Sequence, residues 1–318
     1  MTDLVDLISF IRKEFNKSLN NYSIPKEPKY LYDPIRFSLK SKGKRFRPII
    51  VHLSGRNFKC DPDDLMKVSM GLELLHNFTL VHDDIMDSDD IRRNMPTVHK
   101  KYDVPSAILA GDGIFTISQL ILGNIQDDSH QLLQKYNEMV LEICEGQALD
   151  KQFEMEEKLS LNDYVEMVKK KTGALLGACL SLPAIIVNER IEKINQLYET
   201  GKSLGVGFQI HDDIFEIFGN EDVIGKSLGS DISSNKKTAI SIVAKEKNKV
   251  KWNKLTHQFD GKDLNNIRRF LERNNVKTEV ESIADSYFSA AFSSLKNLHL
   301  DDHNELFNFF KMVQERSY

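Results

Sequence analysis

"FTLVHDDIMDSDDIRR" (residues 78–93) holds five aspartates within eight positions, followed almost at once by two arginines. A second stretch, "FQIHDDIFEIFG" (residues 208–219), repeats the core His-Asp-Asp-Ile among apolar residues and then adds another acid. Acidic runs are usually solvated helix ends, because carboxylates repel one another and prefer water. Two clusters of one design, each inside an apolar helical pattern, favour instead a site that binds something positive.

Helical geometry places the acids of each cluster on defined faces, because residues four apart lie on the same side of a helix. Asp83 and Asp87 share one face, which His76 and Thr79 extend toward the N-terminus. The second cluster repeats this arrangement with Gln209, Asp212 and Glu216. The two clusters are too far apart in sequence for local contact, so we expect them on two helices that face each other across a cavity.

Two facing carboxylate pairs predict a metal site. With oxygen ligands only, the preferred ions are hard cations such as Mg²⁺ or Mn²⁺. Mg²⁺ takes one or two carboxylates and leaves its other positions to water and substrate phosphates. The pattern therefore predicts a Mg²⁺-bridged polyphosphate between the two acidic helices.

Basic residues lie close to the clusters, as a phosphate-binding site requires. The motif "GKRFRP" (43–48) places three cations after a glycine and before a predicted helix. Arg92 and Arg93 follow the first cluster directly, and "KKKTG" (169–173) ends a predicted helix. A basic loop or a helix end explains each motif taken alone, but together they fit a diphosphate clamp.

The composition describes a globular chain without a broad basic surface. Hydrophobic residues make up 41% of the 318 residues, and the net charge of −4 argues against sequence-independent binding of nucleic acid. Three cysteines without metal spacing favour reduced thiols in a cytoplasmic protein. The N-terminus has the pattern of an amphipathic helix rather than that of a signal peptide. The longest apolar run, 173–187, is too short for a membrane span and favours a buried core helix.

Helical periodicity dominates the chain, and strand-like alternation is scarce. We expect an all-α fold in a single domain over residues 1–318, with a capping box at Ser160 and Asp163. The one long loop predicted, 219–237, contains Lys226 and Lys236, and its composition fits a segment that closes over phosphates. Predicted helices cover most of 4–20, 34–40, 47–58, 62–87, 105–125, 128–156, 160–171, 173–188, 191–219 and 237–247, with more toward the end.

These motifs together resemble those of the trans-isoprenyl diphosphate synthases, or polyprenyl synthetases. "GKRFRP", "DDIMD" with "RR", "AGD", "KTG", "FQIHDD" and "GKSLGSD" with a further lysine occur in consistent order from about residue 40 to 245. The resemblance implies an isoprenoid-synthase-type bundle of about ten core helices around a central cavity, and a homodimer. It also implies condensation of isopentenyl diphosphate with an allylic diphosphate (dimethylallyl, geranyl or farnesyl), with release of pyrophosphate.

The resemblance also implies roles for individual residues. The metal site, for about three Mg²⁺ ions or substituting Mn²⁺, takes Asp83, Asp84, Asp87, Asp212, Asp213 and Glu216. The isopentenyl diphosphate site takes Lys44, Arg47, His76 and Arg93. The allylic site takes Arg92, Lys171, Thr172, Gln209, Lys226 and Lys236. The backbone carbonyls near Lys171 and Thr172 and the amide oxygen of Gln209 also face the positive charge of the reacting carbons. The family usually has aspartate where this chain has Glu216, so direct metal ligation by Glu216 is an open point.

Two residues before the first aspartate are implied to set product length. An aromatic residue five positions before Asp83 and a small one four before it, here Phe78 and Thr79, resemble the archaeal-type geranylgeranyl diphosphate synthases. This implies a C20 product, with a C15 farnesyl diphosphate synthase as the alternative. Phe78 lies about 140° around the helix from Asp83, so its ring must lean into the cavity to act as a floor; ordinary core packing is the other interpretation.

Three other functions compete with this interpretation. A terpene cyclase would need Ser or Thr in place of Glu216 and an acid in place of Asn220, and it would leave "GKRFRP" without a role. A metal-dependent phosphohydrolase is suggested by the pairs His82-Asp83 and His211-Asp212, although adjacent residues point about 100° apart on a helix. A non-catalytic regulatory subunit often loses acidic motif residues, and this chain keeps nearly all of them.

Overall fold

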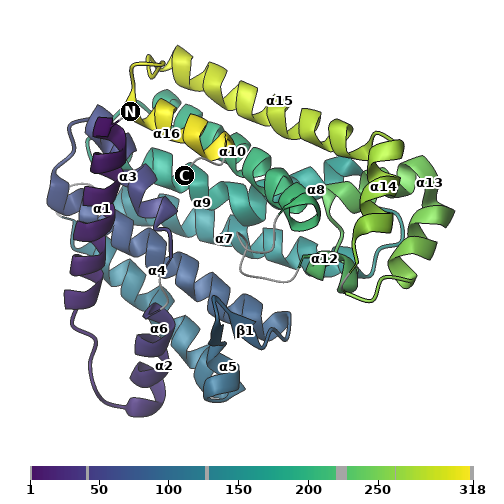
Figure 1. Ribbon diagram of the computed structural model, residues 1–318. Helices are drawn as coiled ribbons and strands as arrows, with labels where there is room; N and C mark the ends of the chain where they lie inside the picture. Colours follow the sequence, from purple (N-terminus) through teal and green to yellow (C-terminus); the bar gives the residue numbers. More distant parts are fainter. Residues whose placement is uncertain (1, 41–42, 126–128, 220–227, 262, 316–318) are drawn as a thin grey trace. The chain divides into compact units, whose positions relative to one another are not determined.

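Helices make up nearly all of the described structure (Figure 1). The computed structural model describes residues 2–40, 43–125, 129–219, 228–261 and 263–315. Its helices are α1 (Thr2–Asn21), α2 (Lys29–Leu39), α3 (Phe46–Asn57), α4 (Pro62–Met86), α5 (Val98–Lys101), α6 (Val104–Gly123), α7 (Ser129–Glu154), α8 (Leu161–Val168), η1 (Lys169–Gly173), α9 (Ala174–Ile185), α10 (Ile191–Phe218), α12 (Ser230–Ser233), α13 (Ala239–His257), α14 (Asn265–Arg273), α15 (Val276–Asn297) and α16 (Glu305–Gln314). The predicted all-α class is confirmed.

Several helices begin where a side chain satisfies the first backbone amides, as helix starts require. Asp61 caps α4 by accepting hydrogen bonds from the backbone N–H groups of Asp63 and Asp64. Ser160 and Asp163 form the predicted capping box at the start of α8. These polar start signals explain why the predicted starts of both helices agree with the observed ones to within one residue, although α8 ends at Val168 and not at 171 as predicted.

α2 begins five residues earlier than predicted. A proline is tolerated best in the first turn of a helix, so the sequence placed the start at Pro34. The helix instead starts at Lys29, because Leu31 and Tyr32 donate their backbone N–H groups to the carbonyl of Pro28. Pro34 then lies inside the helix, where its ring is buried in the core.

A short hairpin after α4 was not predicted. β1 (Ile91–Arg92) and β2 (Met95–Pro96) pair antiparallel, with Arg92 opposite Met95. The two turn residues, Arg93 (φ 51°) and Asn94 (φ 60°), are both left-handed, as a type I′ turn requires. The sequence offers no glycine at this turn, and a left-handed arginine costs on the order of 1 kcal/mol, a strain typical of functional sites.

Contacts group the chain into two compact units. The first unit consists of Met1–Glu138 and Ala178–Asn195. In it, α4 packs along α6 and α3, and α2 also packs on α6 (Figure 1). The core of the first unit includes Phe15, Ile35, Leu74, Ala110 and Ile114. α4 is apolar on most of its surface, so it needs neighbours on several sides.

The second unit consists of Met139–Gly177 and Gln196–Tyr318. In it, α13 packs against α15, α14 and α8. Its core includes Val206, Ile210, Ala239, Trp252, Phe270 and Val280. The prediction of a single domain over residues 1–318 stays a prediction.

The two most apolar helices differ in burial. The predicted core helix at 173–187 is confirmed, because every residue of α9 is buried. α6 was not singled out from the sequence, yet it is the one helix of the described residues with the length and composition of a membrane span. Its mean hydropathy is 1.4, and 44% of it is buried inside the protein. One such helix is weak evidence for a membrane span, and several of its apolar side chains, among them Ile108, Leu109 and Leu120, are exposed.

Candidate active site

The aspartates of the first cluster, at the C-terminal end of α4, differ in exposure. Asp83 and Asp87 are half-buried, whereas Asp84 is only 3% exposed. Asp84 Oδ1 accepts a hydrogen bond from Arg92 Nε at 2.5 Å, and Arg92 Nη2 lies 3.5 Å from Asp89 Oδ2. Asp84 therefore positions Arg92, and its place among the metal ligands stays a prediction.

The hairpin brings the second arginine to the "GKRFRP" motif. A Cβ atom added to Gly43 would lie 3.0 Å from Arg93 Nη1, so the glycine leaves room for the guanidinium group. Arg93 is held there by the left-handed turn between β1 and β2. Two basic motifs that are far apart in the sequence thus meet in the first unit.

Arg47, Arg93 and the neutral His76 form the centre of a cation cluster, in which the two arginines carry the charge. Burial lowers the pKa of His76 well below its ordinary value, and the neighbouring arginines lower it further. Burial also lowers the pKa of the Arg47 and Arg93 guanidinium groups, against the raising effect of Glu73. Arg47 Nε is buried and has no hydrogen-bond acceptor among the described residues. An anion would stabilise such a cluster.

Arg45, the middle cation of "GKRFRP", has a structural role. Its Nη1 lies 2.7 Å from Glu73 Oε1, and both side chains of this pair are buried. Its Nε donates to Asn16 Oδ1 at 2.9 Å, and its guanidinium lies over the ring of Phe15. Arg45 thereby ties α1 to α4. Lys44, by contrast, is exposed.

The second cluster, on α10, shows the same division of exposure. Asp212 and Glu216 are half-buried, whereas Asp213 is only 4% exposed. Asp213 accepts hydrogen bonds from Tyr164 Oη at 2.5 Å, Ala239 N–H at 3.1 Å and Gln209 Nε2 at 3.2 Å. Burial raises the pKa of the Asp213 carboxyl to about 7, against the lowering effect of these three donors. Asp213 joins α8, α10 and α13, and its role as a metal ligand stays a prediction.

The "KKKTG" motif lies in a π-helical turn, η1, between α8 and α9. The backbone N–H of Ala174 donates to the carbonyl of Lys169, five residues earlier. Such wide turns occur frequently at functional sites. A Cβ atom added to Gly146 of α7 would lie 2.3 Å from Lys171 N, so only glycine lets the α7 backbone approach this turn.

Two side chains of the wide turn reach groups of the second acidic region. Thr172 Oγ1 donates to Gln209 Oε1 at 3.3 Å. Lys171 Nζ lies 2.6 Å from Asp150 Oδ2 of α7. The structure thus brings the predicted residues Thr172, Gln209 and Asp213 together. Asp150 was not singled out, because one acid in a long polar helix gives no sequence signal.

Asp231 also belongs to this region, although the sequence analysis did not assign it a role. Its backbone N–H donates to Glu216 Oε1 at 3.3 Å, and its Oδ1 lies 3.9 Å from Lys236 Nζ. Asp213, Glu216, Asp231 and Lys236 line one small cavity of about 10 Å³. The signal was present in "GKSLGSD", whose last residue is Asp231. The predicted Lys226 lies outside the described residues.

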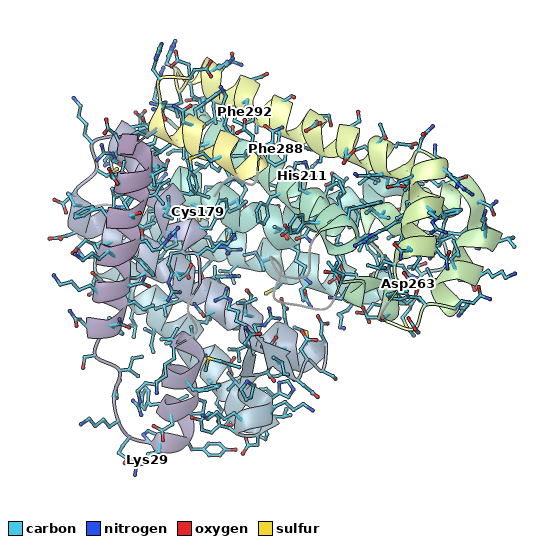
Figure 2. The ribbon with its side chains drawn as sticks, viewed as in Figure 1. Lys29, Cys179, His211, Asp263, Phe288 and Phe292 are labelled. Carbon is cyan, nitrogen blue, oxygen red and sulfur yellow. The ribbon has the colours of Figure 1, made fainter. Side chains whose placement is uncertain are left out.

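The histidines of the two His-Asp-Asp-Ile motifs pack against other helices. His82 Nε2 lies 3.2 Å from the carbonyl oxygen of Ile108 in α6, and its ring contacts Phe78. The ring of His211 packs against Phe288 of α15, with the centroids 5.0 Å apart (Figure 2). These contacts argue against the His-Asp metal pairs of a phosphohydrolase.

Phe78 and Thr79 lie about one turn before the first aspartate in α4. The Phe78 ring packs against Phe115 of α6 with the centroids 5.3 Å apart, and Phe115 stacks on Tyr136 at 6.3 Å. Thr79 Oγ1 donates to the carbonyl of His76 at 2.9 Å. Phe78 is half-buried at the edge of the first unit's core. Its role in product length stays a prediction.

The family model described as Polyprenyl synthetase matches residues 28–276, a range that includes every motif described above. The chain belongs to the polyprenyl synthetase family. This polyprenyl synthetase is 40% identical to the geranylgeranyl pyrophosphate synthase of Geoglobus acetivorans, over 76% of each chain. It is 37% identical to the geranylgeranyl diphosphate synthase of Methanosarcina mazei, over 77% of this chain and 76% of the relative.

Other relatives extend this comparison. The geranylfarnesyl diphosphate synthase of Natronomonas pharaonis is 35% identical over 74% of each chain. A crystal structure of a geranylgeranyl pyrophosphate synthase superposes with a TM-score of 0.91 at 30% identity, covering 97% of this chain and 98% of the other. A second one, from Pyrococcus horikoshii, gives 0.85 at 30% identity, covering 99% and 97%. The predicted isoprenoid-synthase type of helical fold and the transferase class of this polyprenyl synthetase are therefore confirmed.

Proposed function

We propose that this polyprenyl synthetase condenses isopentenyl diphosphate with an allylic diphosphate (dimethylallyl, geranyl or farnesyl) and makes geranylgeranyl diphosphate as its main product. The observation that carries the proposal is the cation cluster of Arg47, Arg93 and His76. It contains a buried guanidinium nitrogen without an acceptor, and Glu73 is the acid that raises the pKa values there. A diphosphate supplies both the charge and the acceptors that this cluster needs.

The acidic faces of α4 and α10 fit a divalent cation such as Mg²⁺. Asp83, Asp87 and Asp212 offer carboxylate oxygens that are not deeply buried, which are the donors Mg²⁺ prefers. Within the described ranges no group of three His, Cys, Asp or Glu side chains is close enough to hold an ion alone. We expect about three ions, replaceable by Mn²⁺, that complete their coordination with water and substrate phosphates. When bound, they supply Lewis-acid stabilisation of the leaving pyrophosphate.

Cationic side chains and the neutral His76 bind the two diphosphates in the proposed reaction. Arg47, His76, Arg93 and Lys44 hold isopentenyl diphosphate, while Arg92, Lys171, Lys236 and Lys226 hold the allylic diphosphate. His76 is neutral at physiological pH because its pKa is lowered, so it donates one N–H to a phosphate oxygen. Arg92 is fixed by Asp84, so its guanidinium needs little reordering when the leaving group gains charge.

The groups near the reacting carbons orient and shield a carbocation. Asp213 accepts a bond from the Gln209 amide nitrogen, which leaves the amide oxygen on the side of Thr172. That oxygen can face positive charge without forming a bond to it. No protein nucleophile is required, and the proton lost from isopentenyl diphosphate goes to the departing pyrophosphate. Water must be excluded, because it would quench the cation.

Product analysis tests this proposal. The protein is incubated with Mg²⁺, radiolabelled isopentenyl diphosphate and each allylic diphosphate in turn, and the products are separated by chain length. We expect a labelled C20 diphosphate from all three starters. Incubation with geranyl diphosphate alone is the control. Release of the free alcohol there would indicate a phosphohydrolase, and no labelled product in any reaction would indicate a regulatory subunit.

The Phe78→Ala variant is expected to make products longer than C20. Removal of the ring takes away the contact with Phe115 and opens the space below Asp83 by several carbon atoms' volume. The measurement is the product chain length with farnesyl diphosphate as starter. Phe292→Ala, which removes a comparable aromatic contact with Phe307 in the second unit, is the matched control and should keep the C20 product. An unchanged C20 product from Phe78→Ala would mean that Phe78 is core packing only.

We also propose that two copies of the chain associate through α6. Four of its apolar side chains are largely exposed: Val104, Ile108, Leu109 and Leu120. Two of them, Leu109 and Leu120, are eleven positions apart and therefore lie within about 20° of each other on one side of the helix. A second copy covers such a stripe with its own, since a twofold interface uses the same surface on both subunits.

The free thiols of Cys60, Cys144 and Cys179 support a reducing, cytoplasmic location, which cell fractionation would test.

The Leu120→Lys variant is expected to convert this dimer into a monomer. Leu120 is 61% exposed at the end of the α6 stripe, and a buried lysine there would bring two like charges together across the twofold axis. Light scattering after size-exclusion chromatography measures the mass. Val250→Lys on α13, where the native valine is 82% exposed, is the matched control and should leave the mass unchanged. A dimer in both variants would place the interface elsewhere.

A further inference from the structure

A large cavity in the second unit has no role in the proposed reaction. It has a volume of about 530 Å³ and lies between the C-terminal end of α7, α12 and α13. One group of lining residues is basic: Lys237, Lys245 and Lys249. Another group is acidic: Glu154, Glu156 and Glu157. The cavity therefore contains charges of both signs, and its volume is many times that of one water molecule, about 30 Å³.

The three lysines of the cavity gather without a carboxylate partner. Lys237 and Lys245 are neighbours in this lining. None of the three forms an ion pair among the described residues, whereas Lys247 on the same helix, which does not line the cavity, pairs with Glu279 at 2.5 Å. Burial lowers the pKa of Lys245, and the charges of Lys237 and Lys249 lower it further. An anion would relieve this repulsion.

The acidic residues of the cavity do not supply that anion. Glu154 pairs with Lys151 outside the cavity at 2.8 Å, and Glu156 and Glu157 are exposed and form no ion pair among the residues described. Carboxylates and lysines that share a cavity without pairing leave room for an occupant between them. Asn253, Thr256 and His257 add further polar groups to the lining. Several cationic donors around one space suit an anion with more than one charged group.

We propose that this cavity binds a phosphate anion with at least two phosphoryl groups, such as inorganic pyrophosphate. Lys237, Lys245 and Lys249 contact its oxygens. The site differs from the proposed allylic site, whose lysine in this segment is Lys236. Lys236 lines the small cavity beside Asp213, whereas Lys237 lines the large one.

The two cavities share a wall, which connects anion binding to the catalytic region. Ile232, Asn235 and Thr256 line both cavities. An anion held by Lys237 therefore acts on the segment that carries Lys236. If the proposed function is correct, on which this step rests, the pyrophosphate released by the reaction inhibits the enzyme from a second site as well as from the allylic site.

Calorimetric titration tests the site. Pyrophosphate is titrated without divalent cations into the wild type, into Lys245→Gln/Lys249→Gln and into Lys251→Gln/Lys254→Gln. The last variant removes the same charge from α13 at lysines that do not line the cavity. We expect the affinity of one binding event to fall roughly tenfold or more in the first double variant. The control variant should keep this event at the wild-type affinity. This event should also weaken with added salt. Equal stoichiometry and affinity in both double variants would overturn the proposal.

Inhibition kinetics separate this site from the proposed function. Without added pyrophosphate, Lys245→Gln/Lys249→Gln should condense substrates at the wild-type rate. At saturating allylic and isopentenyl diphosphates, pyrophosphate should inhibit the wild type and the control but not this variant. If pyrophosphate binding depends on Lys245 and Lys249 but the protein makes no prenyl diphosphate, the proposed site stands and the proposed function is wrong. Condensation with identical inhibition in all three proteins would reject the inhibitory site and keep the function.

Discussion

The Asp83→Ala variant is expected to lose at least about a thousandfold in kcat for condensation, because removal of one charge-stabilising group already costs about a hundred- to a thousandfold. Asp83 is a half-buried carboxylate on the side of α4 that also carries Asp87, and it is the first metal ligand in the proposed site. Without it the leaving pyrophosphate would lose a metal ion that offsets its growing charge. Single-turnover rates with farnesyl and isopentenyl diphosphates measure the loss.

A matched change on the same helix separates chemistry from folding. Asp63→Ala removes an exposed carboxylate in the first turn of α4 and should leave kcat unchanged. Circular dichroism should show the same helix content for Asp83→Ala as for the wild type. The unfolding free energies of the two proteins should agree to within about 0.5 kcal/mol. An Asp83→Ala enzyme with more than a tenth of wild-type activity would remove Asp83 from the metal site.

The Arg45→Met variant is expected to lose about 3–5 kcal/mol of unfolding free energy, because it leaves the carboxylate of Glu73 buried without its partner. The pair is nearly closed to water, with side chains 6% and 5% exposed. Asn16 would also lose a donor, and α1 would lose its tie to α4. Urea unfolding followed by circular dichroism measures the change.

Two further variants identify the cause of that loss. The double variant Arg45→Met/Glu73→Leu should regain much of the stability, since replacing both charges by apolar groups removes the unpaired buried carboxylate. Lys17→Met breaks the exposed pair of Lys17 with Glu14 and should change the unfolding free energy by no more than about 0.5 kcal/mol. A double variant as unstable as Arg45→Met would assign the loss to the contacts of Arg45 with Asn16 and Phe15 instead.

Helical spacing predicted the two acidic faces, because a side chain's direction on a helix follows from its position alone. The capping residues Asp61 and Ser160 allowed the starts of α4 and α8 to be predicted to within one residue, whereas the predicted end of α8 at 171 lies three residues beyond its observed end at Val168. The same spacing did not show which aspartates would be buried. Asp84 and Asp213 are buried because Arg92 and Tyr164 reach them from other elements.

The features that the sequence did not predict depend on backbone geometry and tertiary contact. The β1–β2 turn contains Arg93 and Asn94 in left-handed conformations without a glycine to announce them. Asp150 and Asp231 enter the site through Lys171 and Glu216, which lie far from them in the chain. The resemblance assigned ligand roles to Lys44 and Arg47 only, and the sequence did not show that Arg45 is a buried structural residue, because its partners Glu73 and Asn16 lie far from it in the chain.

The wide turn η1 makes the number of residues between α8 and α9 matter as much as their identity. A bond from Ala174 back to Lys169 encloses one residue more than an ordinary helical bond does. Deleting one of the three lysines would let the turn close into a regular helix and would rotate everything before it by about 100° relative to everything after it. Deletion of a lysine from this segment is therefore expected to disturb the packing of the chain more than substitution of one.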